Sequence, residues 1–293
     1  MTSRVNVQTK RVRYSMASAD PGVLYVVATP IGNLGDLTRR AETVLKTVQI
    51  LAAEDTRRTR VLLDHLDHRV PELKSLHGHN EHAVSEELLA RLLAGADVAL
   101  VSDAGTPLIN DPGFPLVGAA HAAGVKVVPV PGASAVTAAL SVCPLPCQPF
   151  RFIGFLPPKA KQRGDALDAA LASPDAVVFL EAPHRILATL ADLGDRTARR
   201  VMVARELTKR YESLYVGSAE AIKAELGESP RGEIVVVVET AADSAPAVEL
   251  DAARVMDALL TELPPAKAAK IAAQILGAKR SDMYALAELR KTP

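Results

Sequence analysis

Short apolar runs alternate along this chain with segments of helical spacing. The apolar run at residues 23–28 is followed by a Pro/Gly/Asn turn at residues 29–36, and then by helical spacing over residues 37–47. The same order continues with strands expected at residues 50–53, 98–102 and 125–130, and helices at residues 85–94 and 115–123. Such alternation predicts a mostly parallel sheet covered by helices.

A second set of elements begins after a Pro/Cys-rich segment at residues 143–149. Its strands are expected at residues 151–155, 176–180, 201–204 and 234–239, and its helices at residues 164–172 and 184–193. Pro-rich segments with few apolar anchors are typical of linkers between domains, so we place a boundary near residue 145. The pattern therefore predicts two α/β domains, over residues 23–145 and 146–240.

The two ends of the chain follow different patterns. Residues 1–22 are basic and polar without the apolar core of a signal peptide, so we expect a disordered extension. An Ala/Ser/Asp/Pro-rich linker is expected at residues 241–250, followed by a helical tail over residues 251–293. The helices of the tail are expected at residues 251–261, 265–276 and 281–289.

Gly277 between the last two helices of the tail indicates a helix-turn-helix, although any two amphipathic helices joined by a turn give the same pattern. Ser281 is expected to cap the last helix. The packed face of the helix before the turn is expected to hold Ala268, Ile271, Ala272 and Ile275.

Composition and charge add limits to this picture. The 293 residues are 48% hydrophobic but only 3% aromatic, as expected for Ala/Val/Leu-rich cores of helix-covered sheets. Lys+Arg and Asp+Glu both number 34, so any nucleic-acid contact would rely on local basic patches. No apolar run is long enough for a membrane span, which favours a cytoplasmic protein without membrane contact. Cys143 and Cys147 are too few for a disulfide framework or a zinc site.

Loops that follow the predicted strands hold the candidate chemistry, because open α/β sheets bind ligands beyond the carboxyl ends of their strands. The loop at residues 29–36 lacks the GxGxxG spacing of a nicotinamide site. In the loop at residues 102–113, Asp103 and Asp111 lie among small residues that let a ligand approach the backbone. Both Asp side chains could instead cap the turn, an alternative that we leave open.

Two further groups of loops stand out. The loop at residues 131–137 places Ser134 at a helix start, where it could act as an N-cap without any ligand. Charged residues gather at residues 181–185, 205–209 and 231–233. Charged side chains at strand ends rarely serve a core, so we favour a functional role for them.

Ten segments of these loops occur in the order found in the ribosomal RNA branch of the tetrapyrrole-methylase family: ATPIGNLGDLT, AAEDTRRT, HNE, SDAGTPLINDPG, VPGASA, FIGFLP, EAPHR, ARELTK, YE and GE. The chain resembles that branch over roughly residues 23–240, and in its helical tail. The resemblance implies a homodimer that binds S-adenosylmethionine, without a metal, in a cleft between two α/β domains. It further implies 2′-O-methylation of a cytidine in 16S ribosomal RNA of the small ribosomal subunit.

The resemblance also implies roles for individual residues. Cofactor contacts are expected from Pro30, Gly32, Asp103, Ala104, Gly105, Thr106, Ser134, Ala135, Pro183, Leu207 and Gly232. Contacts with the RNA are expected from Arg57, Arg58, His79, Asn80 and Glu81. The arginines could equally form a solvated helix face. Leu180 departs from the aromatic residue expected in many relatives, which weakens the case for a substrate contact there.

A 2′-hydroxyl is a poor nucleophile at neutral pH, so a base or a nearby cation would help. The catalytic candidates are Glu181, His184, Arg185, Glu206 and Lys209. Inter-strand ion pairs, such as Glu181 with Arg205 or Glu206 with Arg185, are the structural alternative. A histidine cluster at residues 77–82 lacks acidic or thiolate partners at a known ligand spacing, which favours polar loop residues over a metal site.

Two other functions remain open at this point. The first is a methyltransferase of the same fold that acts on a tetrapyrrole such as a precorrin, or one of the diphthine type. The second is a non-catalytic nucleic-acid-binding regulator, because Lys267, Lys270, Lys279 and Arg280 of the tail suit phosphate contacts. The AAEDTRRT and HNE segments, together with the tail, favour the ribosomal RNA enzyme over both.

Overall fold

The computed structural model describes residues 20–241 and 252–290, which form two compact units divided after Ala241. Each unit is described by itself. The expected N-terminal extension, up to residue 19, and the expected linker, from residue 242, lie outside the described residues. None of the helices within these two ranges is long and apolar enough to cross a membrane.

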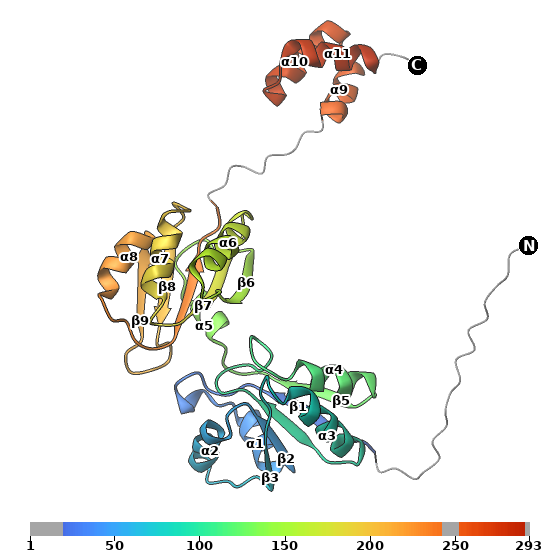
Figure 1. Cartoon of the computed structure of the whole chain (residues 1–293). Coiled ribbons are helices and arrows are strands. Elements are labelled where there is room, and N and C mark those ends of the chain that lie inside the picture. The colour runs from blue at the N-terminus through green and yellow to red at the C-terminus, as the bar shows by residue number, and fades with distance from the viewer. Residues whose placement is uncertain (1–19, 242–251, 291–293) are drawn as a thin grey trace, which may run out of the picture. The chain divides into compact units, whose positions relative to one another are not determined.

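The first sheet is entirely parallel (Figure 1), with strand order β3-β2-β4-β1-β5. Its strands are β1 (Val23–Val27), β2 (Ile50–Ala53), β3 (Glu72–Ser75), β4 (Val98–Val101) and β5 (Lys126–Val130). β2 and β4 are buried at every position, as a continuous apolar run requires of a strand covered on both faces. The parallel sheet expected from the alternating pattern is therefore confirmed.

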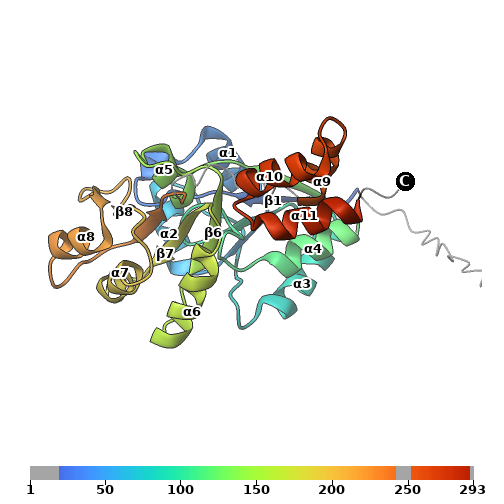
Figure 2. The same cartoon turned by 90° about the horizontal axis from the view of Figure 1, so that it is seen from above.

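Helices cover both faces of the first sheet. Its helices are α1 (Arg39–Thr47), α2 (Thr56–His65), α3 (Glu81–Leu93) and α4 (Phe114–Ala122), with a short 3-10 helix at Leu34–Asp36. Leu45 of α1 and Leu63 of α2 pack on one face. Leu88 of α3 and Leu116 of α4 pack on the other, where the two helices lie side by side (Figures 1 and 2). This arrangement leaves the loops at the carboxyl ends of the strands free to build a site.

The second sheet is mixed, with strand order β6-β7-β10-β8-β9. Its strands are β6 (Phe150–Phe155), β7 (Ala176–Glu181), β8 (Val201–Arg205), β9 (Ser213–Gly217) and β10 (Ile234–Val238). Only β6 and β7 pair in parallel, because β10 enters the centre of the sheet antiparallel to both of its neighbours and β9 returns antiparallel to β8. The first compact unit thus has the two sheets of α/β character expected from the sequence, only the first of which is parallel.

Helices of unequal extent cover the second sheet. Three of them, α6 (Ala160–Leu171), α7 (Ile186–Gly194) and α8 (Ala219–Leu226), pack on the same face. The opposite face meets α5 (Ala135–Ser141) and Ile31 from the loop after β1. That second face therefore joins the two sheets and borders the space between them.

The second unit is a three-helix bundle of α9 (Ala252–Leu260), α10 (Pro265–Leu276) and α11 (Arg280–Leu289). Gly277 ends α10 in the left-handed conformation, with φ of 63°, as expected for a glycine C-cap. Two details of the sequence prediction are wrong. Lys279, not Ser281, is the N-cap residue of α11. Ile271 and Ile275 lie outside the core of the bundle, to which α10 contributes buried Ala268, Ala269 and Ala272.

The hydrophobic pattern missed β3, β9 and α8, whereas the helix start expected at Ser134 is the start of α5, and the helix face named as an alternative for the arginines is part of α2. β3 is only four residues long and contains Glu72 and Lys74, so its pattern does not differ from that of a loop. α8 did carry a usable signal, because the hydroxyl of Ser218 accepts a hydrogen bond from the backbone N–H of Ala221 at its start. The missed strands are short and lie at sheet edges, where few side chains are buried and the apolar pattern is therefore weak.

Candidate functional site

A cavity of about 410 Å³ lies between the carboxyl ends of the first-sheet strands and the second sheet. The first domain and α5 contribute Ile31, Glu54, Arg58, Asp103, Ala104, Gly105, Thr106, Ile109, Asp111, Ser134, Ala135 and Val136. The second sheet and its loops contribute Phe152, Phe155, Leu180, Glu181, Ala182, Pro183, Ala204, Leu207, Gly232, Glu233, Ile234 and Val235. The cavity is therefore a joint product of both sheets.

Most of the residues that the resemblance assigned to the cofactor line this cavity: Asp103, Ala104, Gly105, Thr106, Ser134, Ala135, Pro183, Leu207 and Gly232. Two of them do not. Pro30 lines a smaller space together with Arg58 and Asp103, and Gly32 lies against the side chain of Lys209. Of the catalytic candidates only Glu181 lines the cavity, and of the RNA candidates only Arg58.

Backbone hydrogen bonds fix the loops that form the floor of the cavity. Thr29 and Gly105 exchange two of them, at N···O distances of 2.9 and 3.0 Å. Gly105 has φ of +85°, and a Cβ there would lie 3.2 Å from Ile31 Cγ2. The Thr106 hydroxyl donates to the Ala133 carbonyl at 3.1 Å. The loops after β1, β4 and β5 are thus joined into one rigid surface.

Ser134 starts α5, but its side chain makes no capping hydrogen bond. Ser134 is therefore the N-cap residue of α5 by position, but not through a hydrogen bond of its side chain. Ser134 also lines the cavity.

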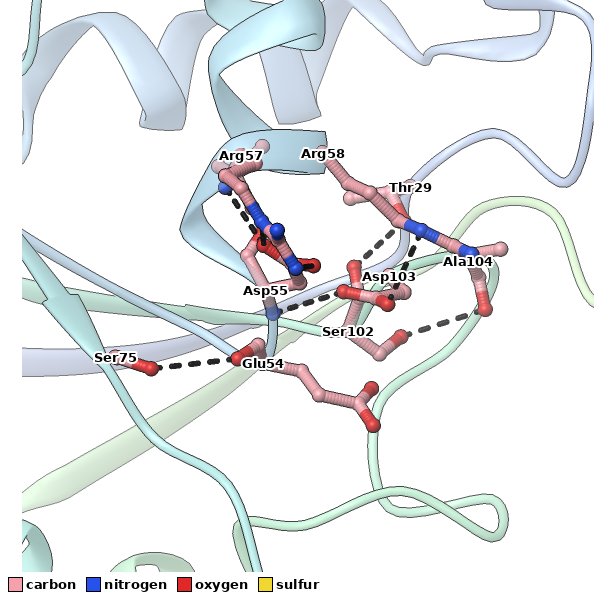
Figure 3. Close-up of polar contacts among 10 residues, drawn as sticks. Thr29, Glu54, Asp55, Arg57, Arg58, Ser75, Ser102, Asp103 and Ala104 are labelled. Carbon is pink, nitrogen blue, oxygen red and sulfur yellow. Dashed lines mark hydrogen bonds and ion pairs between the residues drawn. The ribbon is translucent and has the colours of Figure 1, made fainter.

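Acidic and basic side chains meet at the start of α2 (Figure 3). Asp103 accepts a hydrogen bond from the backbone N–H of Asp55 at 2.9 Å, and its other oxygen lies 3.5 Å from Nε of Arg58. Arg57 pairs instead with Asp55 at 2.9 Å, and its hydrogen bonds lower the pKa of Asp55 to about 2. Figure 3 shows the Glu54 side chain extending away from Arg57. Asp103 is thus oriented by two partners at the cavity wall.

Two carboxyl groups in the cavity have raised pKa values. Burial raises the pKa of Asp111 to about 6, and the nearby charges of Glu54 and Asp103 add to this effect, although a hydrogen bond with Ser102 opposes it. Burial, followed by the charge of Asp103, also raises the pKa of Glu54. Carboxylates that are costly to ionise in this way favour a positively charged ligand beside them.

Glu181 is buried and its carboxylate is fully occupied. One oxygen lies 2.6 Å from the guanidinium of Arg185 and accepts a hydrogen bond from the N–H of Ala182, while the other accepts from the Thr189 hydroxyl at 2.6 Å. Arg185 in turn donates to the Leu156 carbonyl. The suggested pairing of Glu181 with Arg205 is wrong. Because both oxygens are engaged, Glu181 is suited to hold the turn after β7 and not to act as a base.

Lys209 joins the loop after β8 to the start of β10. Its ammonium lies 2.9 Å from Glu206 Oε1 and 3.2 Å from Glu233 Oε2. Burial opposes ionisation of Glu206, but Lys209 and the backbone N–H of Glu233 together lower its pKa. The suggested pairing of Glu206 with Arg185 is therefore wrong, since the loop fold brings Lys209 to this carboxylate.

Two glycines make room for this ion network. A Cβ on Gly32 would lie 2.4 Å from Lys209 Cγ, and one on Gly232 would lie 2.4 Å from the Glu206 carboxyl carbon. Gly232 also has φ of +92°, a conformation that other residues rarely adopt. Gly32 therefore lets the Lys209 stem of the second domain pack on the first loop of the first domain.

The remaining candidates brace other loops. Asn80 accepts from the N–H of His77 and donates to the Ser75 carbonyl, while Glu81 accepts from the N–H of Gly113 at 2.5 Å. His79 and His184 do not line the cavity. Across residues 20–241 and 252–290, no three His, Cys, Asp or Glu side chains are grouped as a metal ion requires. The hydrogen bond that Glu81 accepts from Gly113 anchors the end of the loop that includes Asp111.

Family comparisons agree with this fold. The sequence model of the tetrapyrrole (corrin/porphyrin) methylases matches residues 23–223, and that of the RsmI C-terminal HTH domain matches residues 246–290. The chain is therefore a methylase by class. Specifically, it belongs to the tetrapyrrole methylase family and, within it, to the ribosomal RNA small subunit methyltransferase I branch.

Relatives of that name match nearly end to end. The protein from Xylella fastidiosa (strain Temecula1) is 48% identical over 269 residues, which cover 90% of this chain and 98% of the relative. The protein from Escherichia coli O157:H7 is 45% identical over 279 residues, which cover 93% and 96%. Both relatives are named ribosomal RNA small subunit methyltransferase I.

Solved structures share the fold at lower identity. The methyltransferase CobJ has a TM-score of 0.56 at 20% identity and covers 75% of this chain and 95% of its own. Uroporphyrin-III C-methyl transferase from Thermus thermophilus, complexed with S-adenyl homocysteine, has a TM-score of 0.53 at 21% identity, with coverage of 74% and 98%. Diphthine synthase has a TM-score of 0.56 at 14% identity, with coverage of 74% and 90%. These likenesses establish the fold alone.

The raised pKa of Asp111 predicts a pH-dependent cost to stability. Between the usual pKa of an aspartate and about pH 6, Asp111 is protonated in the folded chain but ionised in the unfolded chain. Over this range, its contribution to the free energy of unfolding therefore falls as pH rises. Asp111→Asn removes the charge, and we expect it to melt a few degrees above the wild type at about pH 8, with little difference at about pH 4. Calorimetry at the two pH values measures this gap. A gap of the same size at both would contradict the prediction.

Proposed function

We propose that this chain transfers a methyl group from S-adenosylmethionine to the 2′-hydroxyl of a cytidine in 16S ribosomal RNA of the small ribosomal subunit. The observation that carries the proposal is the near-complete match to relatives named ribosomal RNA small subunit methyltransferase I, joined to a cavity lined by most of the expected cofactor residues. Uroporphyrin-III-C-methyltransferase and diphthine synthase match in fold only, at 21% and 14% identity. A non-catalytic regulator led by the tail would not account for the cavity.

The cavity fits S-adenosylmethionine in size and in chemistry. Its volume of about 410 Å³ falls in the range of small-molecule sites. Glu54, Asp103 and Asp111 suit the positive charges and hydroxyl groups of this cofactor, and the small residues Gly105 and Ala135 allow close approach to the backbone. When bound, the cofactor supplies a methyl group made electrophilic by its positively charged sulfur.

Proton removal from the ribose hydroxyl needs a carboxylate that is free to accept it. The two acids first considered are engaged elsewhere, since Arg185 and Thr189 hold Glu181, and Lys209 holds Glu206. We assign the role of base to Asp111, which lines the cavity and has a pKa of about 6. A carboxylate with that pKa is mostly ionised at neutral pH and more basic than an ordinary aspartate.

The other catalytic candidates act through the loops that they hold. Arg185 fixes Glu181 and the Leu156 carbonyl, and the Lys209–Glu206 pair fixes the loop that includes cavity residue Leu207. We assign these three charged residues to positioning. Alignment of the hydroxyl with the methyl group depends on such fixed walls, because small misplacements of reacting groups reduce rates strongly.

The RNA is proposed to approach over the start of α2. Arg58 lines the cavity with a side chain that is 63% exposed, and the neighbouring Arg57 side chain is 85% exposed. Arginines placed in this way suit phosphate contacts that position a substrate without reading its sequence. We further propose a cytoplasmic homodimer, in which the second subunit helps to hold a large RNA; sedimentation at micromolar concentration tests this state.

A direct assay tests the proposed function. The full-length protein is incubated with S-adenosylmethionine, labelled in its methyl group, and small ribosomal subunits from a strain that lacks the enzyme. We expect label at a 2′-oxygen of a 16S cytidine, located by mass spectrometry of nuclease fragments, and none with subunits that already carry the methyl group. Label on a base, or only on a precorrin offered in parallel, would contradict the proposal.

Replacement of Asp103 tests the cofactor site. Asp103→Ala removes a carboxylate oriented by Asp55 and Arg58, and we expect the affinity for S-adenosylmethionine to fall on the order of 10- to 100-fold, as for loss of a charge-assisted hydrogen bond. Calorimetric titration measures the affinity. Arg57→Ala is the matched control, since Arg57 belongs to the same surface but does not line the cavity. A folded Asp103→Ala variant with unchanged affinity would refute the assignment.

Removal of residues 249–293 tests the role of the tail. Exposed Lys267, Lys270, Lys279 and Arg280 are proposed to contact phosphates, so removal should weaken binding to the small subunit. The slope of log affinity against log salt concentration should become less negative by on the order of one for each phosphate contact that is lost. Subunit binding is measured at two salt concentrations, with cofactor affinity expected to stay unchanged. A lowered melting temperature with an unchanged salt slope would instead make the tail a structural element.

A further inference from the structure

Two exposed apolar side chains lie at the cavity, one from each domain. Ile109, in the loop after β4, is 45% exposed, and Phe155, the last residue of β6, is 51% exposed. Both side chains also line the cavity, so their exposed surfaces are at the opening of the site. The chain has only five phenylalanines. A half-exposed aromatic side chain at a cavity indicates a contact with a ligand.

An irregularity in β6 brings Phe155 to this position. Phe152 pairs with Val178 of β7, but Phe155 pairs with Leu180, so β6 has one residue more than its partner over this stretch. Side chains alternate between the faces of a strand, and the extra residue returns Phe155 to the face of Phe152 and Leu180. Without it, the side chain of Phe155 would point to the opposite face. Bulges of this kind commonly redirect a side chain beside a functional site.

The opposing loop is held against the bulge. Gly154 has φ of +68°, and a Cβ there would lie 2.5 Å from the side-chain oxygen of Asn110. On either side of Ile109, Leu108 and Asn110 have φ of 71° and 79°, a left-handed conformation that is uncommon for residues other than glycine. Backbone strain of this kind persists where surrounding structure enforces it, often at ligand sites. The close fit of Asn110 against Gly154 thus keeps Ile109 and Phe155 together at the opening.

We propose that Phe155, assisted by Ile109, is a stacking platform for a nucleobase of the RNA substrate, namely the base of the methylated nucleotide turned out of its helix. Unpaired bases of RNA are commonly bound by stacking on aromatic side chains. Arg58, on the same cavity, supplies the cation for an adjoining phosphate. The inference rests on the proposed function, because it concerns how the RNA enters that same site.

The arrangement favours a base over an apolar protein segment. Carboxylates and an arginine line the same cavity as the apolar pair, so an occupant must offer a flat apolar surface and polar groups together. A nucleotide has this combination, with a π-face on the base and a charged phosphate. Stacking also tolerates any base, so Phe155 would hold the target nucleotide without selecting it.

Binding of the small ribosomal subunit to Phe155→Ala, in the full-length protein, tests the proposal. We expect an affinity about 5- to 150-fold weaker, the range measured for loss of one stacked base. Phe155→Tyr keeps the aromatic face and should bind like the wild type. Phe114→Ala is the matched control, because Phe114 is 77% exposed but does not line the cavity, and we expect no change.

Three further measurements separate the possible results. Unchanged affinity of Phe155→Ala for the subunit would overturn the proposal. An equal loss of affinity for S-adenosylmethionine would make Phe155 part of the cofactor wall, and a shift from dimer to monomer in sedimentation would place it between two copies of the chain; either result overturns the proposal. Failure of the proposed function itself is distinct, because the wild type would then not methylate the subunit in the parallel assay.

Discussion

The two backbone hydrogen bonds between Thr29 and Gly105 are the constraint on which the site depends. They join the loops after β1 and β4, the adjacent central strands of the parallel sheet, directly beyond their carboxyl ends. Gly105 can take part because it lacks a side chain in a left-handed conformation, where a Cβ would press on Ile31. The bridge acts together with the hydrogen bonds of Asp103 to Asp55 and of Thr106 to Ala133, which hold the same loop at the floor of the cavity.

Several charged residues at the ends of the second-sheet strands pair with one another. Glu181 with Arg185, and Lys209 with Glu206 and Glu233, form ion pairs that hold loops in place at the ends of the second-sheet strands. Buried or partly buried pairs are costly to break once formed, because removal of one partner leaves an uncompensated charge. The carboxyls that we propose for chemistry are Asp111 and Glu54, whose pKa values burial has raised.

The two sheets contribute in different ways. The parallel sheet brings all of its carboxyl ends to one edge, and so collects the loops that bear Glu54, Asp103 and Ser134. The mixed sheet offers a broad apolar face of Val178, Met202 and Val235, interrupted at β6 by the bulge that turns Phe155 toward the cavity. A polar edge facing an apolar wall suits a ligand with a charged end and an aromatic end, as S-adenosylmethionine has.

The sequence by itself determined the alternating α/β order, the helical tail and the loops where ligand chemistry is placed, because apolar periodicity and turn residues are local properties. The sequences of the loop motifs also indicated the family and many of the residues that line the cavity. Tertiary structure alone decided the partners of the charged residues: Glu181 meets Arg185 and not Arg205, and Glu206 meets Lys209 and not Arg185. It also decided the antiparallel entry of β10, the bulge that redirects Phe155 and the burial that raises the pKa of Asp111. Each of these depends on which distant segments meet in space, and residue spacing along the chain does not carry that information.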